Sequence, residues 1–198
     1  SDLLIIAYKE LRKFEMELLK RIQELELEKT GQLSKPFSVI QVSQFYGIEI
    51  DDFACEIAIL SLWLAEHQMN ISFKDEFGEV LPTLPLKQSG NIFRNNSLYS
   101  NWEEVCSNDG EVYIIGNPPY VGQRNQEDIH KSDMEHVFKD YENYKKLDYI
   151  SCWFLKASKY IKNIQKVAFV TTSSICQGAQ VDMLWPKIFG LDIDIIFA

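Results

Sequence analysis

The sequence predicts an α/β fold in which a parallel sheet is covered by helices on both faces. Short apolar or β-branched runs alternate with longer segments of helical periodicity, which is typical of parallel sheets. The apolar runs end directly at polar residues, and open α/β sheets bind their ligands at such strand ends. With 198 residues, of which 46% are hydrophobic, the chain is long enough to bury one core.

The bulk composition narrows the class of protein. Charged residues make up 25% and aromatic residues 13%, as in globular domains. No apolar run is long enough to span a bilayer and no leader segment opens the chain, so we expect a cytoplasmic protein. Four scattered cysteines and three histidines predict free thiols and no metal site. The net charge of −9 argues against tight binding of nucleic acid by this segment alone, because such affinity comes from lysine and arginine.

A long amphipathic helix is expected over residues 3–28. Leucines recur there every seven residues, at Leu4, Leu11, Leu18 and Leu25. A helix that lies on a sheet is favoured over a coiled coil, because Glu15 interrupts the second seam position and the heptads are few. Residues 31–36 contain a glycine and a proline and end this helix.

A strand and a second helix are expected next. Residues 45–50 form a short apolar run that closes with an acid. Asp51 can cap the following helix, and Asp52 and Glu56 lie near its positive end. This helix is predicted to run to about Asn70. Its apolar residues along one face are Phe53, Ile57, Leu60 and Leu64.

Residues 71–90 carry two prolines and two glycines and are predicted to form a loop, followed by a weak strand at 91–93. A β-branched strand is expected at 111–115, and a polar, mobile segment at 121–132.

The C-terminal third is predicted to alternate between helix and strand. Helices are expected at 147–163 and 181–189, and strands at 166–171 and 192–197. The inward residues of the first of these helices are predicted to be Trp153, Phe154, Ala157, Tyr160 and Ile161.

The most specific feature is Asn117-Pro118-Pro119-Tyr120, placed directly after the strand at 111–115. Two prolines remove two backbone donors and fix two φ angles, which makes a stiff loop with free carbonyl acceptors. The asparagine adds a side-chain acceptor, and the aromatic ring offers a stacking face for a base. Acceptors that converge on one amino group hold its two hydrogens and orient its lone pair. The pattern therefore favours chemistry at an exocyclic amino group. The alternative is a turn, in which the tyrosine only packs.

With this motif the chain resembles the gamma-type DNA amino-methyltransferases, which methylate N6 of adenine, and in particular the large bacterial restriction-modification and orphan methylases. Asn117 to Tyr120 match the fourth, catalytic motif of the family. The resemblance implies a Rossmann-like sheet, S-adenosylmethionine as cofactor, double-stranded DNA as partner and a bacterial cytoplasmic location. It also implies that the target adenine flips out of the duplex and stacks on Tyr120. Its N6 would donate hydrogen bonds to the Asn117 side chain and the Pro118 carbonyl.

Two further motifs imply cofactor-binding residues. Residues 46–51 resemble the second motif, in which an acid at the strand end, here Glu49, binds the cofactor ribose hydroxyls. Ile50 matches a position that packs on the adenine of the cofactor. Residues 95–98 resemble the third motif, in which Asn96 would bond the adenine amino group. Without the resemblance, Glu49 is interpreted as a solvated acid at a strand end and Asn96 as a turn residue.

Residues 148–151 and the helix after them resemble the fifth motif, and residues 168–178 resemble the segment that borders the target pocket. The glycine-rich first motif of the family is absent, since the chain starts where the helix after that motif begins. The chain also ends where a sixth strand is expected, before any target-recognition domain. We therefore expect residues 1–198 to be part of a catalytic domain, with fragment boundaries at both ends and no activity alone.

The absent first strand has a physical consequence. In this fold that strand lies centrally, so two inner strands are left with unpaired edges, which promote pairing with other chains. We expect this segment to self-associate or to be partly disordered. Most phosphate contacts with DNA are expected outside it, because of its acidic charge.

Two other functions stay open. The same Asn-Pro-Pro-Tyr loop serves methyltransferases that act on a glutamine of protein release factors or on RNA adenine. The length of the segment at 71–90 and the Gln177-Gly178 pair favour the DNA family. A non-enzymatic scaffold or specificity partner is the other alternative, and such a protein need not bind any cofactor.

Overall fold

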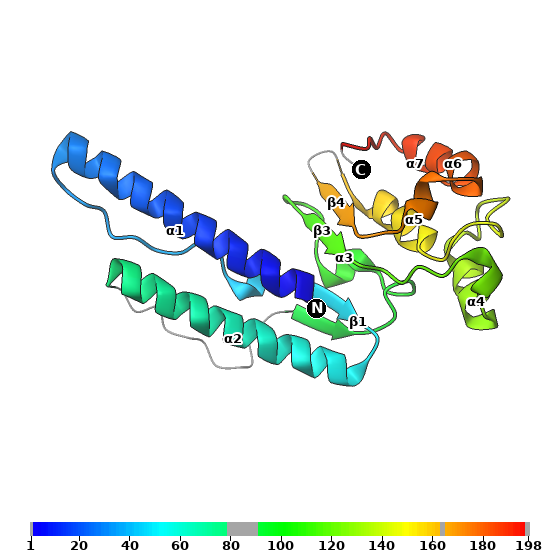
Figure 1. Ribbon diagram of the computed structural model, residues 1–198, viewed down its shortest axis with the longest axis horizontal. Coiled ribbons are helices and arrows are strands. Elements are labelled where there is room, and N and C mark those ends of the chain that lie inside the picture. The colour runs from blue at the N-terminus through cyan, green and yellow to red at the C-terminus, as the bar shows by residue number, and fades with distance from the viewer. Residues whose placement is uncertain (1, 79–90, 163–164, 197–198) are drawn as a thin grey trace. The chain divides into compact units, whose positions relative to one another are not determined.

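The computed structural model describes residues 2–78, 91–162 and 165–196. The chain divides into two compact units, Ser1–Ser97 and Leu98–Ala198. Each unit contains one pair of parallel strands together with helices (Figure 1). The mixed helix and strand content and the parallel pairing of strands agree with the sequence prediction.

The first unit is built from two long helices and a small sheet. Helix α1 packs along helix α2, and strand β1 pairs in parallel with strand β2 (Figure 1). The buried side chains of this core are Tyr8, Val42, Leu62, Ala65 and Met69. In chain order the elements are α1 (Asp2–Thr30), η1 (Val42–Gln44), β1 (Tyr46–Glu49), α2 (Asp52–Phe77) and β2 (Asn91–Arg94).

The start of α2 was predicted correctly and its end was not. The Asp51 side chain caps the helix by accepting a hydrogen bond from the backbone N of Ala54 at 2.8 Å. The helix passes the predicted end at Asn70 because the residues that follow contain no helix breaker and Phe73 is fully buried. It ends where Gly78 adopts a φ of +71°, which favours glycine. The predicted loop thus loses its first residues to α2, and residues 79–90 lie outside the described part.

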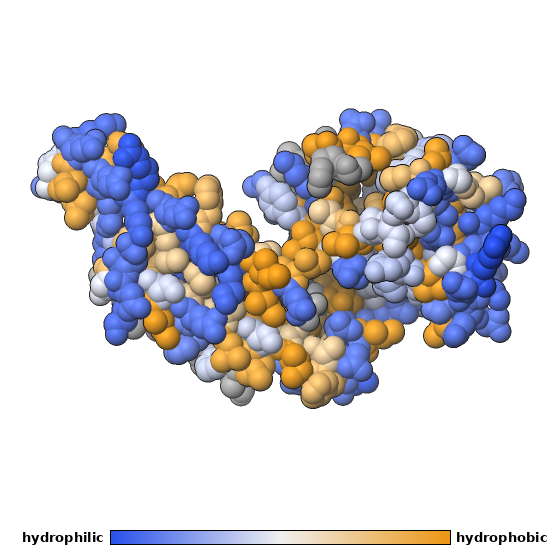
Figure 2. Space-filling model, in the orientation of Figure 1, coloured by the Kyte–Doolittle hydropathy of each residue, from blue (hydrophilic) through white to orange (hydrophobic). Residues whose placement is uncertain are grey.

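Helix α2 buries a different face from the one that the sequence suggested. The side chains that pack inward are Cys55, Ala58, Leu62, Ala65, Met69 and Phe73. The predicted apolar face is exposed instead, with fractions between 43% for Ile57 and 74% for Phe53. Figure 2 shows hydrophobic residues at the surface over the N-terminal part of α2. Because this helix is apolar on two opposite sides, periodicity does not decide which side packs against α1.

Arg12 holds the two helices of the first unit together. This residue of α1 is 2% exposed, and its guanidinium donates to Asn70 Oδ1 of α2 and to the carbonyl of Ile40, both at 3.3 Å. Its Nε lies 3.5 Å from Glu15 Oε2. Glu15 in turn accepts from the backbone N of Val39 at 2.6 Å. The pair therefore fixes α2 and the extended segment before β1 onto α1.

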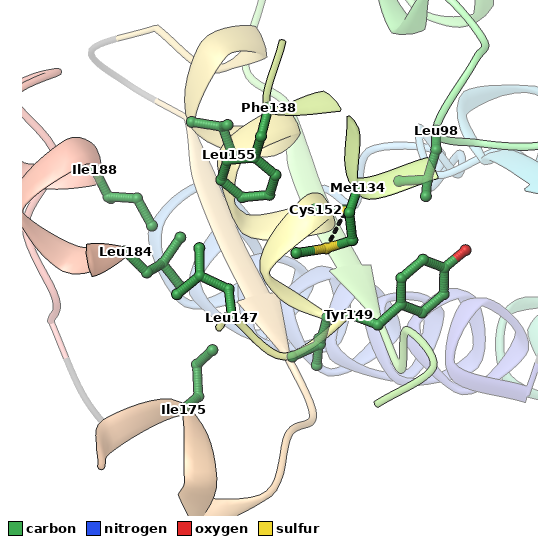
Figure 3. Packing of buried hydrophobic residues seen from close by; sticks show 11 residues of the cluster. Leu98, Met134, Phe138, Leu147, Tyr149, Cys152, Leu155, Ile175, Leu184 and Ile188 are labelled. Atoms are coloured by element: carbon green, nitrogen blue, oxygen red, sulfur yellow. Dashed lines mark hydrogen bonds between the residues drawn. The ribbon is translucent and has the colours of Figure 1, made fainter. Parts of the chain in front are cut away.

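The second unit surrounds a pair of parallel strands with short helices. Strand β3 pairs with β4, with Tyr113 opposite Lys166 and Gly116 opposite Phe169. Figure 3 shows the buried cluster of this unit, in which Met134 of α4 lies next to Cys152 of α5; Leu155, Leu184 and Ile188 belong to the same cluster. In chain order the elements are α3 (Trp102–Val105), β3 (Tyr113–Gly116), η3 (Gln123–Asn125), α4 (Asp128–Val137), α5 (Ser151–Tyr160), β4 (Lys166–Phe169), η4 (Ser173–Cys176), α6 (Ala179–Met183) and α7 (Trp185–Phe189).

Several predictions for the second unit need correction. The segment at 121–132, expected to be polar and mobile, contains η3 and the start of α4, because Met134 and Phe138 are buried and hold that helix in the core. The helix predicted at 147–163 is limited to α5, and its two most buried apolar residues, Cys152 and Leu155, were not among those expected to point inward.

The chain after β4 also departs from the prediction. One helix was expected at 181–189, but α6 and α7 are separate because Pro186 has no N–H for a continuous helix. The strand predicted at 192–197 is absent from the described residues 192–196. Asp192 has a φ of +57° and closes a turn after α7, and residues 193–196 make no ladder with β4.

The strands of the described residues form two separate pairs rather than one sheet. The order is β1-β2 in one pair and β3-β4 in the other. An intact seven-stranded sheet, which would have contradicted the expectation of a missing central strand, is not found in residues 2–78, 91–162 and 165–196.

Candidate active site

The carboxyl end of the first strand pair brings together the three residues predicted to bind cofactor. The backbone N of Asn95 donates to the carbonyl of Glu49 at 2.9 Å, so the ends of β1 and β2 lie side by side. The Glu49 carboxylate accepts from the backbone N of Ile50 at 2.9 Å and of Asp51 at 3.2 Å. Asn96 follows directly, with its backbone N bonded to Asn95 Oδ1 at 2.9 Å.

These residues offer distinct chemical groups at one edge. Glu49 supplies a carboxylate, which is a strong hydrogen-bond acceptor. Ile50 presents an apolar side chain that is 65% exposed, although the three strand residues before it are half-buried. Asn96 carries an amide that can both donate and accept. An acceptor, an apolar face and an amide can together bind a ribose and an adenine ring.

In the second unit, the Asn117-Pro118-Pro119-Tyr120 motif follows β3 as predicted. Gly116 precedes it and lies against the Phe169 ring, since a Cβ at this position would be 3.3 Å from two ring carbons. This close approach favours glycine. Pro118 is buried, whereas Asn117 and Tyr120 face solvent. The loop is therefore anchored in its middle and exposes the amide and the phenol ring.

The far end of this loop is held by Tyr149 and Gln126, and the sequence predicts no role for either side chain. The Val121 carbonyl accepts from the backbone N of Tyr149 at 3.0 Å and from Gln126 Nε2 at 3.3 Å. The same Gln126 amide also donates to the Leu147 carbonyl at 2.9 Å. Gln126 lies in the segment expected to be mobile, so only the fold reveals this role.

Tyr149 is itself fixed by a buried acid. Its hydroxyl donates to Asp133 Oδ2 of α4, and Asp133 is 4% exposed. Burial, together with the Asp133 carboxylate, raises the pKa of Tyr149 above its usual value, so the phenol stays neutral. The His130 ring meets the Tyr149 ring edge-on at 4.8 Å. This arrangement stabilises the segment that supports the loop.

The loop after β4 lies beside the loop after β3. The backbone N of Val170 donates to the Gly116 carbonyl at 2.9 Å, which extends the pairing past the strands. Ser174 Oγ donates to Asp148 Oδ2 at 2.6 Å, and Thr172 Oγ1 lies 2.7 Å from Ser174 Oγ. The resemblance predicts that this segment borders a target pocket, and in the structure its Ser174 hydroxyl contacts Asp148.

Metal binding and membrane insertion have no structural counterpart in the described ranges. No group of three or more metal-binding side chains gathers there, and no helix there has the length and hydrophobicity to cross a membrane. Each histidine stacks on or contacts an aromatic ring: His67 on Trp63, His130 on Tyr149 and His136 on Tyr99.

Comparison with known proteins gives the class of this chain, which is a DNA-methyltransferase domain. The family model "MmeI, DNA-methyltransferase domain" matches residues 1–198. The chain belongs to this family.

Two relatives illustrate the similarity. DNA methyltransferase A of Bacillus subtilis (strain 168) is 50% identical over 202 residues, which cover 100% of this chain and 22% of that protein. The Type IIL restriction-modification enzyme MmeI, solved in complex with DNA, has a TM-score of 0.82 and 39% identity. That match covers 95% of this chain and 25% of the other. The chain thus spans about a quarter or less of the length of these relatives.

Proposed function

We propose that this chain forms part of the catalytic domain of an S-adenosylmethionine-dependent DNA methyltransferase that methylates N6 of adenine in a restriction-modification system. The observation that carries the proposal is the Asn117-Pro118-Pro119-Tyr120 loop, which is anchored at Pro118 and exposes Asn117 and Tyr120 at the end of β3. The family and both relatives support DNA as the substrate.

The loop suits an exocyclic amino group. The Asn117 side-chain oxygen and the Pro118 carbonyl accept the two hydrogens of N6, which leaves the nitrogen lone pair free to act as the nucleophile. Tyr120, which is 52% exposed, stacks on the adenine after it leaves the duplex. No covalent enzyme intermediate is needed, so catalysis rests on positioning.

The edge formed by β1 and β2 suits the cofactor. Glu49 accepts hydrogen bonds from the ribose hydroxyls, Ile50 packs on the adenine ring, and Asn96 bonds its amino group. Bound S-adenosylmethionine supplies an electrophilic methyl group. The strand pairs correspond in this proposal to parts of a Rossmann-like sheet.

The test uses the full-length protein that carries this sequence. It is incubated with duplex DNA and methyl-labelled S-adenosylmethionine, the DNA is digested, and the labelled nucleoside is identified. We expect the label in N6-methyladenine. Asn117→Ala is expected to lower transfer by at least about 100-fold with unchanged cofactor affinity, whereas Asn117→Asp keeps an oxygen acceptor and is expected to retain measurable transfer.

The other outcomes separate the alternatives. Label in protein or RNA but not in DNA would assign the chain to glutamine or RNA methylation. Absence of label, together with absence of cofactor binding, would leave a scaffold or specificity partner. Loss of cofactor binding in Asn117→Ala would make Asn117 a structural residue rather than a catalytic one.

A further inference from the structure

We propose that Asp148 is a positioning residue that ties the catalytic loop, residues 117–122, to the loop after β4, residues 170–176. This inference rests on the proposed function for its catalytic consequence, although the tie itself can be tested without activity. Asp148 belongs to a motif whose individual residues received no role from the sequence.

The Asp148 carboxylate lies between the two loops. Its Oδ2 accepts from Ser174 Oγ at 2.6 Å, a length typical of a charge-assisted hydrogen bond. Thr172 Oγ1 lies 2.7 Å from the same Ser174 oxygen. On the other side, a Cβ on Gly122 would lie 3.8 Å from Asp148 Oδ1, so this carboxylate oxygen borders the end of the catalytic loop.

The backbone around Asp148 makes the connection rigid. Its carbonyl accepts from both the backbone N of Ser151 at 2.9 Å and Ser151 Oγ at 2.6 Å, which fixes it to the first residue of α5. Its neighbour Tyr149 donates its backbone N–H to the Val121 carbonyl at 3.0 Å. Ser151 is fully buried, so this anchor is part of the core.

The consequence concerns rate rather than binding. Loops at strand ends are held by few buried contacts, and a displacement of about 1 Å in a reacting group can lower the rate about 100-fold. Loss of the Asp148–Ser174 bond frees the loop after β4 and removes one side of the support for residues 120–122. The residues proposed to bind cofactor lie on other strands and keep their contacts.

The experiment compares Asp148→Ala, Asp148→Asn, Ser174→Ala and the double variant D148A/S174A in the full-length protein. Asp140→Ala, which changes an exposed acid of the same unit, is the matched control. We expect Asp148→Ala and Ser174→Ala each to lower kcat about 10- to 100-fold, with KM for DNA and the cofactor Kd within about twofold. The kcat of the double variant is expected to equal that of Asp148→Ala, because both substitutions remove the same hydrogen bond.

Asp148→Asn distinguishes positioning from direct action on the substrate. The amide keeps an oxygen that can accept from Ser174, so we expect kcat within about fivefold of the wild type. A loss as large as in Asp148→Ala would overturn the proposal, since it would mean that the negative charge itself acts on the substrate. Additive losses in the double variant would overturn it too.

Hydrogen exchange of the full-length protein supplies a readout that does not need activity. We expect faster exchange at the amide of Tyr149, which donates to the Val121 carbonyl, and at those of residues 172–176 in Asp148→Ala and Ser174→Ala, and no change in Asp140→Ala. Unchanged exchange at both places would overturn the tie. If Asp148→Ala does not fold, Ser174→Ala removes the same hydrogen bond by changing the other partner, which is half-buried, and its exchange rates then test the tie. Failure of the wild type to methylate DNA would refute the proposed function alone.

Discussion

At the scale of single residues, the candidate site depends on which side chains are anchored and which are left free. Pro118 is buried, whereas Asn117 and Tyr120 at the two ends of the motif face solvent. A large aromatic residue at a strand end usually packs into the core, yet the Tyr120 side chain remains half exposed. The exposure fits a stacking role better than a packing role.

Substitution of Tyr120 tests that stacking role. We expect Tyr120→Ala to weaken the extruded-base complex by about 1–3 kcal/mol, the usual contribution of an aromatic stack. Tyr120→Phe keeps the ring and is expected to behave like the wild type. The measurement is fluorescence of a 2-aminopurine placed at the target adenine in DNA bound to the full-length protein. Equal signals for both variants would exclude stacking by the ring.

The same scale shows what the sequence could not reveal. Gln126, Asp133 and Tyr149 support the catalytic loop through bonds that join residues far apart in the chain. Nothing in the local pattern marks Gln126, which lies in a polar stretch, or Asp133, which resembles a solvated acid. Tyr149 lies in the segment that resembles the fifth motif, but the sequence predicts no role for its side chain. Their burial and pairing exist only after α4 has packed on α5.

At the scale of elements, the first unit depends on a buried charged residue. Arg12 is enclosed between the rings of Tyr8 and Phe73 and donates to Asn70 and Ile40. Burial raises the pKa of Tyr8 to about 12, partly offset by the Arg12 charge. The guanidinium therefore joins α1, α2 and the segment before β1 with a geometry that a lysine lacks.

Replacing Arg12 tests this role. We expect Arg12→Ala to lower the free energy of unfolding of the first unit by about 3 kcal/mol, because buried acceptors lose their partner. Arg12→Lys is expected to recover little, since it keeps the charge but not the planar donor set. Arg21→Ala removes an exposed arginine of the same helix that pairs with Glu24 and should change stability by less than about 0.5 kcal/mol. Urea denaturation would measure all three, and a similar small change for Arg12→Ala and Arg21→Ala would contradict the prediction.

The helix ends illustrate where local signals decide and where they do not. Asp51 caps α2 through its own side chain, so the sequence located that end. The C-terminal end of α2 is set by Gly78, which is the first helix breaker after Asn70 and comes before the prolines of the following segment. The choice of the buried face of α2 depended on α1, which offers Tyr8 and Arg12 to one side only.

At the scale of the whole molecule, the acidic charge determines the expected DNA binding and the unpaired strand edges determine the expected self-association. A net charge of −9 opposes autonomous DNA binding, and the chain spans 22% of its Bacillus relative. In the described residues β1 pairs only with β2, and β3 only with β4. Each pair therefore presents backbone groups that another strand can bind.

The unpaired strand edges of the β1-β2 and β3-β4 pairs predict that the 198-residue chain self-associates. Light scattering after size-exclusion chromatography is expected to give a mass above that of the monomer, rising with concentration. Ile115→Lys places a charge on β3 and is expected to lower the associated fraction, whereas Ile129→Lys, an exposed apolar residue of α4, serves as the control. A monomeric mass at all concentrations would contradict the prediction of self-association.

The sequence by itself determined the helix and strand alternation, the parallel pairing, the cap at Asp51 and the position of Asn117 to Tyr120 after a strand. These features depend on periodicity and on local chemistry within a few residues. Tertiary structure alone decided which face of α2 is buried, that α4 forms in a polar segment, and that Asp148, Ser174 and Gly122 lie together. These depend on contacts between residues distant in the chain, whose energies no local pattern contains.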